Sequence, residues 1–132
     1  MTSKFAIEAL GDTLRLELEQ FGIQVSLVEP GSIATPIWTK AAGTAGEVVE
    51  GITAEQRKLY GRQIQGLRQG LVRAAESGIP AEKVATTIAK ALTAPRPKTR
   101  YLVGRDAKVN ARMSALLPDR ATDRMKARRM GL

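Results

Sequence analysis

The chain has 132 residues, a net charge of +8 and 43% hydrophobic residues, a composition that fits one globular domain at most. It contains no cysteine and no histidine. Disulfides, thiolate or imidazole metal sites, cysteine nucleophiles and Ser-His-Asp catalysis are therefore excluded, and no metal site is expected. The sequence shows no apolar run of about 18 residues and no signal-peptide pattern, which favours a cytoplasmic protein.

The positive charge is concentrated at one end. Residues 1–95 carry ten Lys/Arg and ten Asp/Glu, whereas residues 96–132 carry eleven Lys/Arg and three Asp. A charge-balanced main part and an aromatic content of 4% argue against a nucleic-acid binder. Residues 119–132 are predicted as a basic tail. This tail is either a solvated terminus or a weak contact with an anionic membrane surface, which would make the protein peripheral to a membrane.

Residues 3–21 are predicted to form an amphipathic helix, because apolar side chains recur at spacings of four and three. These side chains are Ala6, Leu10, Leu14, Leu18 and Phe21. Gly22 is predicted to cap the helix in a left-handed conformation. Residues 23–29 (IQVSLVE) predict a strand that is apolar enough to be buried on both faces of a parallel sheet, and Pro30-Gly31 ends it.

Helical and strand patterns continue to alternate along the rest of the chain. Residues 32–52 are predicted as a loop, and residues 53–76 as a helix weakened by three internal glycines, each of which costs about 1 kcal/mol relative to alanine. A helix over 79–94, a strand over 100–104 and a helix over 107–117 follow. This order indicates an α/β protein with a parallel sheet. Two strands are too few for a stable buried sheet, so the chain is expected to be part of something larger.

Three separated blocks resemble the C-terminal half of a short-chain dehydrogenase/reductase. They are SKFAIEAL, FGIQVSLVEPGSIATP, and the run from PAEKVATTIAKALTAPRPKTRYLVGRDAK to ALLPDR. The last run is similar to the branch that contains retinol and hydroxysteroid dehydrogenases. The resemblance implies the C-terminal portion of a Rossmann-like doubly wound parallel sheet over residues 1–118, with residues 36–78 as a substrate-lid insertion. It also implies NAD(P)-dependent hydride transfer to or from a lipophilic alcohol or carbonyl, with NADP favoured.

The same resemblance assigns the site residues. The lysine of the family's Tyr-x-x-x-Lys motif corresponds to Lys4, which would tune the catalytic tyrosine and bind the nicotinamide ribose. Pro30 and Gly31 turn the chain at the cofactor site. The Ile33 backbone would meet the nicotinamide carboxamide, and the Thr35 hydroxyl would contact the amide or phosphate. The residues that follow, Ile37 and Trp38, lead into the substrate loop, and a core or interface role is the alternative for Trp38.

Other parts of the family's machinery have no counterpart in the sequence. The motif's tyrosine would stand immediately ahead of Met1, and its serine and asparagine further ahead. No glycine-rich GxGxxG or GxxxGxG pattern occurs, so the pyrophosphate cradle is missing. The N-terminal half is therefore expected to be absent and the chain inactive alone. A truncated gene and an internal methionine treated as a start are both compatible with this pattern.

The leading hypothesis is therefore an oxidoreductase fragment. The alternative is a non-enzymatic remnant that acts through association, since an uncovered apolar stripe needs a partner. In the family, the helix that corresponds to residues 3–21 commonly packs in a dimer interface, so a homo-oligomer through this helix is expected.

Overall fold

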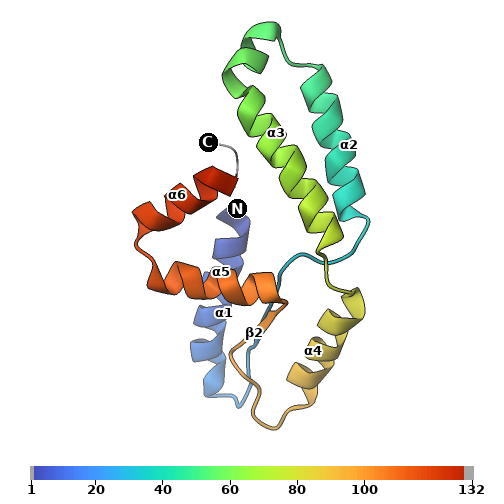
Figure 1. The fold of residues 1–132 in the computed structure, drawn as a ribbon. Coiled ribbons are helices and arrows are strands. Elements are labelled where there is room, and N and C mark those ends of the chain that lie inside the picture. Colours follow the sequence, from blue (N-terminus) through green and yellow to red (C-terminus); the bar gives the residue numbers. More distant parts are fainter. Residues whose placement is uncertain (1, 130–132) are drawn as a thin grey trace.

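The computed structural model describes residues 2–129, which form six helices and two strands (Figure 1). In chain order they are α1 (Thr2–Glu19), β1 (Leu27–Pro30), α2 (Ile37–Glu50), α3 (Ala54–Glu76), α4 (Ala81–Thr93), β2 (Arg100–Val103), α5 (Arg105–Leu116) and α6 (Asp119–Arg129). The predicted alternation of helices and strands is confirmed, and the protein is of the α/β class.

The two strands form a parallel pair in which Leu27 lies opposite Arg100 and Pro30 lies opposite Val103. Helix α4 packs against both strands, and α5 packs against β2. A parallel pair with helical connections is a partial doubly wound arrangement, as the sequence predicts. The first strand begins at Leu27 rather than at residue 23, because the ladder starts only where the second strand runs alongside it.

Little of the chain is buried. Among the described residues, Val103 is the one buried hydrophobic side chain, with 6% of its surface exposed. The total accessible area is 10,579 Å², whereas a compact protein of this mass exposes about 6,800 Å². The expectation of a strand covered on both faces is wrong for this chain, since residues 27–29 are only half-buried. The apolar surface of the sheet and helices is therefore incompletely covered.

Helix α1 shows this exposure most clearly. Of its predicted inner face, Leu14 and Leu18 are half-buried, but Leu10 and the following Phe21 remain 57% and 67% exposed. The helix crosses the sheet at Gly11, the buried residue of α1, where a Cβ atom would come within 2.8 Å of the Leu27 side chain. The predicted left-handed glycine after the helix is confirmed at Gly22, with a φ of 71°.

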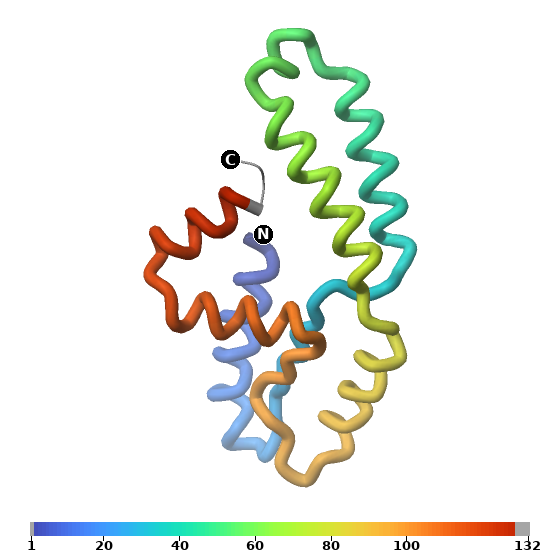
Figure 2. The backbone as a smooth tube through the Cα atoms, viewed as in Figure 1, coloured from blue at the N-terminus to red at the C-terminus, as the bar shows by residue number. Residues whose placement is uncertain are grey.

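The segment 36–78 is a helical hairpin. Helices α2 and α3 pack against each other and project away from the sheet (Figure 1), and the backbone leaves and returns at the same place (Figure 2). The predicted loop over 32–52 is thus wrong over most of its length, because three alanines and the apolar face of α2 offset its glycines. Helix α3 is continuous, and a capping box between Thr53 and Gln56 closes its N-terminus with hydrogen bonds of 3.2 and 2.8 Å.

The C-terminal elements lie close to their predicted positions, with one exception. Residues 119–129 of the predicted basic tail form helix α6, which Leu117 and Pro118 separate from α5. Residues 130–132 of the predicted basic tail, with Met130 and Leu132, lie outside the described residues. Over residues 2–129, every helix is too short or too polar to traverse a lipid bilayer.

Candidate functional site

The candidate site is the loop that follows β1, over residues 30–35. The two parallel strands end side by side at Pro30 and Val103, and the Gly31 N–H donates to the Val103 carbonyl at 2.9 Å. The loop therefore lies at the carboxyl edge of the sheet, next to the start of α5. Ligands bind at this edge in open α/β sheets.

Asp106, in the first turn of α5, fixes the start of the loop. Its Oδ2 accepts a hydrogen bond from the Ser32 N–H at 2.6 Å. A Cβ atom at Gly31 would overlap this carboxylate, so a larger residue there would displace the Asp106 side chain. Burial raises the pKa of Asp106, but hydrogen bonds to its carboxylate, led by those from the Ser32 and Ala107 backbone, hold the pKa below its usual value.

This arrangement predicts how stability depends on pH. Because the pKa of Asp106 is lowered by folding, its contribution is present above the unfolded value of about 3.9 and is lost as the pH falls through the folded value. Replacing Asp106→Asn should flatten the acid side of a plot of melting temperature against pH. The test is thermal unfolding followed by circular dichroism between pH 6 and 3, where parallel curves for the two proteins would contradict this role.

The other end of the loop is tied to the base of the hairpin. Ile33 and Ile79 form an isolated parallel bridge. The Ile79 N–H donates to the Ser32 carbonyl, and the Ala34 N–H donates to the Ile79 carbonyl, both at 2.9 Å. Gly78 makes this approach possible, since a Cβ there would lie 2.6 Å from the Ala34 nitrogen. The hairpin is therefore held at both of its ends beside the candidate site.

Trp38 closes the loop from the first turn of α2. Its indole Nε1–H donates to the Ile33 carbonyl at 2.6 Å, and its ring is half-buried. Its neighbour Ile37 is 62% exposed. Within residues 2–129, neither the Ile33 N–H nor the Thr35 hydroxyl makes a hydrogen bond to another residue. The loop thus presents a free backbone donor and a free hydroxyl at the edge of the sheet.

Lys4 lies in the first turn of α1 and is exposed. It forms no hydrogen bond or ion pair with any other residue of the described range 2–129, so the structure brings the predicted loop residues together but does not join Lys4 to them. Its position depends instead on how α1 is attached to the sheet.

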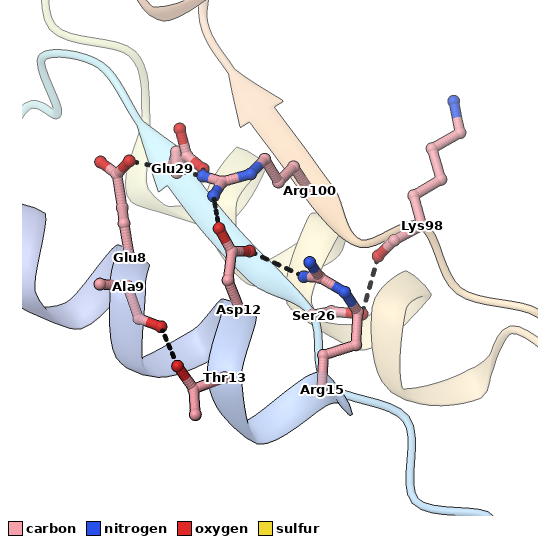
Figure 3. Close-up of polar contacts among 9 residues, drawn as sticks. All are labelled: Glu8, Ala9, Asp12, Thr13, Arg15, Ser26, Glu29, Lys98 and Arg100. Atoms are coloured by element: carbon pink, nitrogen blue, oxygen red, sulfur yellow. Dashed lines mark hydrogen bonds and ion pairs between the residues drawn. The ribbon is translucent and has the colours of Figure 1, made fainter. Parts of the chain in front are cut away.

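That attachment is an ionic cluster around Arg100 on β2 (Figure 3). Its guanidinium lies 2.6 Å from Glu29, 2.9 Å from Asp12 and 3.5 Å from Glu8. The hydrogen bond to Glu29 raises the pKa of Arg100, against the effect of burial. A hydrogen bond from Arg15 lowers the pKa of Asp12, with Arg100 adding to that effect. One arginine thus joins α1, β1 and β2.

The predicted residues fit the nicotinamide end of a dinucleotide. A carboxamide needs a donor and an acceptor side by side, and Ile33 offers its free N–H and the second lone pair of its carbonyl, with the Thr35 hydroxyl nearby. The pyrophosphate end has no matching glycine-rich turn in this chain. The loop can therefore hold part of such a cofactor.

Comparison with known proteins decides the family. No protein-family model matches the sequence. The chain is 35% identical over 124 residues to the NADPH-dependent 3-dehydrocapnine reductase of Ornithobacterium rhinotracheale, covering 94% of this chain and 41% of that protein. It is 35% identical over 99 residues to the 17-beta-hydroxysteroid dehydrogenase type 1 of Mus musculus, covering 75% and 28%. Retinol dehydrogenase 5 of Mus musculus is 33% identical over 130 residues, covering 92% and 40%.

The chain belongs to the short-chain dehydrogenase/reductase family. It spans only 28–41% of the length of these relatives. The matched region includes the loop after β1 and the α2–α3 hairpin.

Two features of the site were missed from the sequence. Asp106 is an acidic residue in a first helical turn, directly after a strand and Gly104, and such residues often cap helices. Its second role, holding the Ser32 N–H, depends on the distant β1 loop. The Arg100 cluster had a weak signal in Glu8 and Asp12, which are spaced to share one face of α1.

Proposed function

We propose that the chain is the C-terminal portion of an NAD(P)-dependent oxidoreductase of the short-chain dehydrogenase type, with NADP as the favoured cofactor. Residues 1–118 form its share of the Rossmann-like domain, residues 36–78 the substrate lid, and residues 119–132 a basic C-terminal segment. The observation that carries the proposal is the loop over 30–35, which offers the Ile33 N–H and the Thr35 hydroxyl at the carboxyl edge of the sheet.

The nicotinamide, when bound, donates or accepts the hydride. The Ile33 backbone and the Thr35 hydroxyl would hold its carboxamide. Lys4 would act on a tyrosine placed one helical turn earlier, a residue that this chain does not contain. The lysine's positive charge would stabilise the phenolate and lower the phenol pKa from about 10, so that the phenol could exchange a proton with the substrate oxygen. Lys4 would also hydrogen-bond the ribose.

The substrate is proposed to be a lipophilic alcohol or its carbonyl. Relatives are named for a hydroxysteroid, for retinol and for 3-dehydrocapnine. Ile37 and Trp38 would form the entrance of the substrate pocket, where the hairpin leaves the loop. The exposure of Ile37 provides apolar surface for such a molecule.

Association is the second candidate function, favoured by the exposed apolar side chains of α1. Its exposed side chains are 57–71% accessible, and they include Phe5, Ile7, Leu10 and Leu16. A surface of this kind is normally covered by a partner. Sedimentation of the purified chain distinguishes the two cases, since a stable oligomer that ignores dinucleotides would favour association alone.

The proposed function is tested on a completed protein. This is a chimera in which the part of the Ornithobacterium reductase that precedes its matched region is joined ahead of Met1. At an NADPH concentration 100 times the Kd, binding should stabilise it by about 2.7 kcal/mol and raise its melting temperature by roughly 5–10 °C. Thr35→Val should weaken NADPH binding about tenfold or less, whereas the control Thr93→Val on α4 should not. An NADPH-independent melting temperature would overturn the proposal.

A further inference from the structure

We propose that Arg100 is a positioning residue for Lys4. It fixes the rotation of α1 on the sheet, so that Lys4 reaches the nicotinamide loop over residues 30–35. This inference rests on the proposed function, because it gives a role in that reaction to a residue outside the reacting groups.

Helix α1 runs antiparallel to β1 (Figure 1). Near the C-terminal end of the helix, Leu16 lines a pocket together with Val25, which precedes the strand. Near the middle of the helix, Gly11 approaches the side chain of Leu27, the first residue of β1. The first turn of α1, which carries Lys4, therefore points toward the carboxyl edge of the sheet.

The level of Lys4 along the sheet follows from the rise of each element. The helix from Gly11 back to Lys4 covers about 10 Å, and the strand from Leu27 to Gly31 covers about 13 Å. Lys4 thus lies near the level at which the nicotinamide loop begins. A rotation of α1 about its axis would keep this level but would swing Lys4 away from the loop.

The approach at Gly11 leaves that rotation free, because a glycine has no side chain to interlock with the strand. Arg100 fixes it, since its guanidinium lies 2.9 Å from Asp12 and 3.5 Å from Glu8 on α1 (Figure 3). The same guanidinium lies 2.6 Å from Glu29 on β1. Within residues 2–129, no other ion pair or side-chain hydrogen bond joins α1 to either strand.

The face of α1 that Arg100 holds also carries Lys4. Lys4, Glu8 and Asp12 follow one another at spacings of four, which places them along one face of a helix. Without the arginine, three uncompensated carboxylates would face one another between α1 and β1. Their repulsion would turn this face of the helix away from the sheet, and Lys4 would turn with it.

A contribution to stability alone is the alternative role for this cluster. Its four side chains are 30–44% exposed, and ion pairs that are open to water usually stabilise a protein only slightly. The main effect of Arg100 is therefore on the orientation of α1, and the two measurements below separate orientation from stability.

The first measurement is the distance from α1 to the sheet in the full 132-residue chain. Because the chain has no cysteine, spin labels can be directed to Lys4→Cys and to Lys90→Cys on α4, a helix that packs against both strands. Arg100→Met should shift or broaden the distance distribution from pulsed electron paramagnetic resonance. The matched control Arg112→Met, at an exposed position on α5, should leave it unchanged.

An unchanged distribution in the Arg100→Met protein would overturn the inference. Circular dichroism checks that each variant is folded. If Arg100→Met does not fold, Arg100→Lys takes its place, because a lysine keeps the charge but lacks the planar fork that holds both elements. The same shift or broadening is expected for this variant, and its absence would equally overturn the inference.

The second measurement is the pH profile of kcat in the chimera that tests the proposed function. Lys4 lowers the pKa of the phenol, so Arg100→Met should move the apparent pKa of the profile upward and reduce kcat at least tenfold. Arg112→Met should change neither. The double variant Lys4→Ala/Arg100→Met should be no slower than Lys4→Ala alone, because both changes remove the same interaction.

Two failures of this measurement are distinguishable. A chimera with neither turnover nor NADPH-dependent melting would overturn the proposed function and this inference with it. An active chimera in which Arg100→Met leaves the profile unchanged, or in which the two losses add, would overturn only the positioning role of Arg100.

Discussion

Replacing Gly78 by alanine is expected to lower the free energy of unfolding by about 1–3 kcal/mol. The new Cβ would lie 2.6 Å from the Ala34 nitrogen and 2.9 Å from the Ile33 carbonyl carbon. Both atoms belong to the backbone, so the loop cannot relieve the overlap by rotating a side chain. The bridge between Ile33 and Ile79 should break, and the hairpin should lose its attachment beside the site. Urea unfolding followed by circular dichroism measures the change.

Gly70→Ala is the matched control for this prediction. Gly70 lies within helix α3, and a Cβ there would meet no atom within 4 Å. Alanine should therefore raise the free energy of unfolding by about 0.5–1 kcal/mol, because it has the higher helix propensity. If the two substitutions changed stability equally, the close approach at Gly78 would have no energetic role.

The second large effect concerns turnover. The 132-residue chain by itself is expected to oxidise no NADPH with a lipophilic carbonyl substrate, whereas the proposed function predicts that the chimera defined above does so. No tyrosine stands four residues before Lys4, and the sequence has no glycine-rich phosphate cradle. The phenols that are present, Tyr60 and Tyr101, are followed four residues later by Ile64 and by Arg105, so neither forms the Tyr-x-x-x-Lys motif. Absorbance at 340 nm measures the reaction.

Turnover by the chain alone would contradict this account, especially if it were lost on Tyr101→Phe. That result would indicate a different proton donor, with Arg105 as its basic neighbour. If such turnover were lost at the same temperature at which the circular dichroism signal of the chain melts, the turnover would belong to the folded chain and not to a contaminant.

The sequence predicted elements best where local pattern and tertiary packing agree. The helices over 79–94 and 107–117 and the strand over 100–104 correspond closely to α4, α5 and β2, whose local patterns are strong and which contact one another in the structure. Helix α2 was missed because its AAGTAGE stretch has the composition of a loop, and its stability comes from packing against α3. A local pattern does not contain that contact.

Some features of the candidate site could likewise be predicted from the local sequence, and others could not. The turn at Pro30-Gly31 and the position of the loop at the sheet edge follow from residues that are adjacent in the sequence. The hydrogen bond from Ser32 to Asp106 and the ion pair from Glu29 to Arg100 join residues more than 70 positions apart. Their geometry depends on the register in which β1 and β2 pair. The sequence indicates that the two strands are parallel, but it does not indicate that register.

The most direct test of the central claim is the turnover of the chimera after Lys4→Ala, with Lys108→Ala on α5 as the matched control. The claim is that this chain supplies the lysine and the nicotinamide loop of a short-chain dehydrogenase/reductase. Lys4→Ala should reduce kcat by about 10²-fold or more, while Lys108→Ala retains it. Equal turnover in the two variants, with NADPH binding intact, would contradict the account.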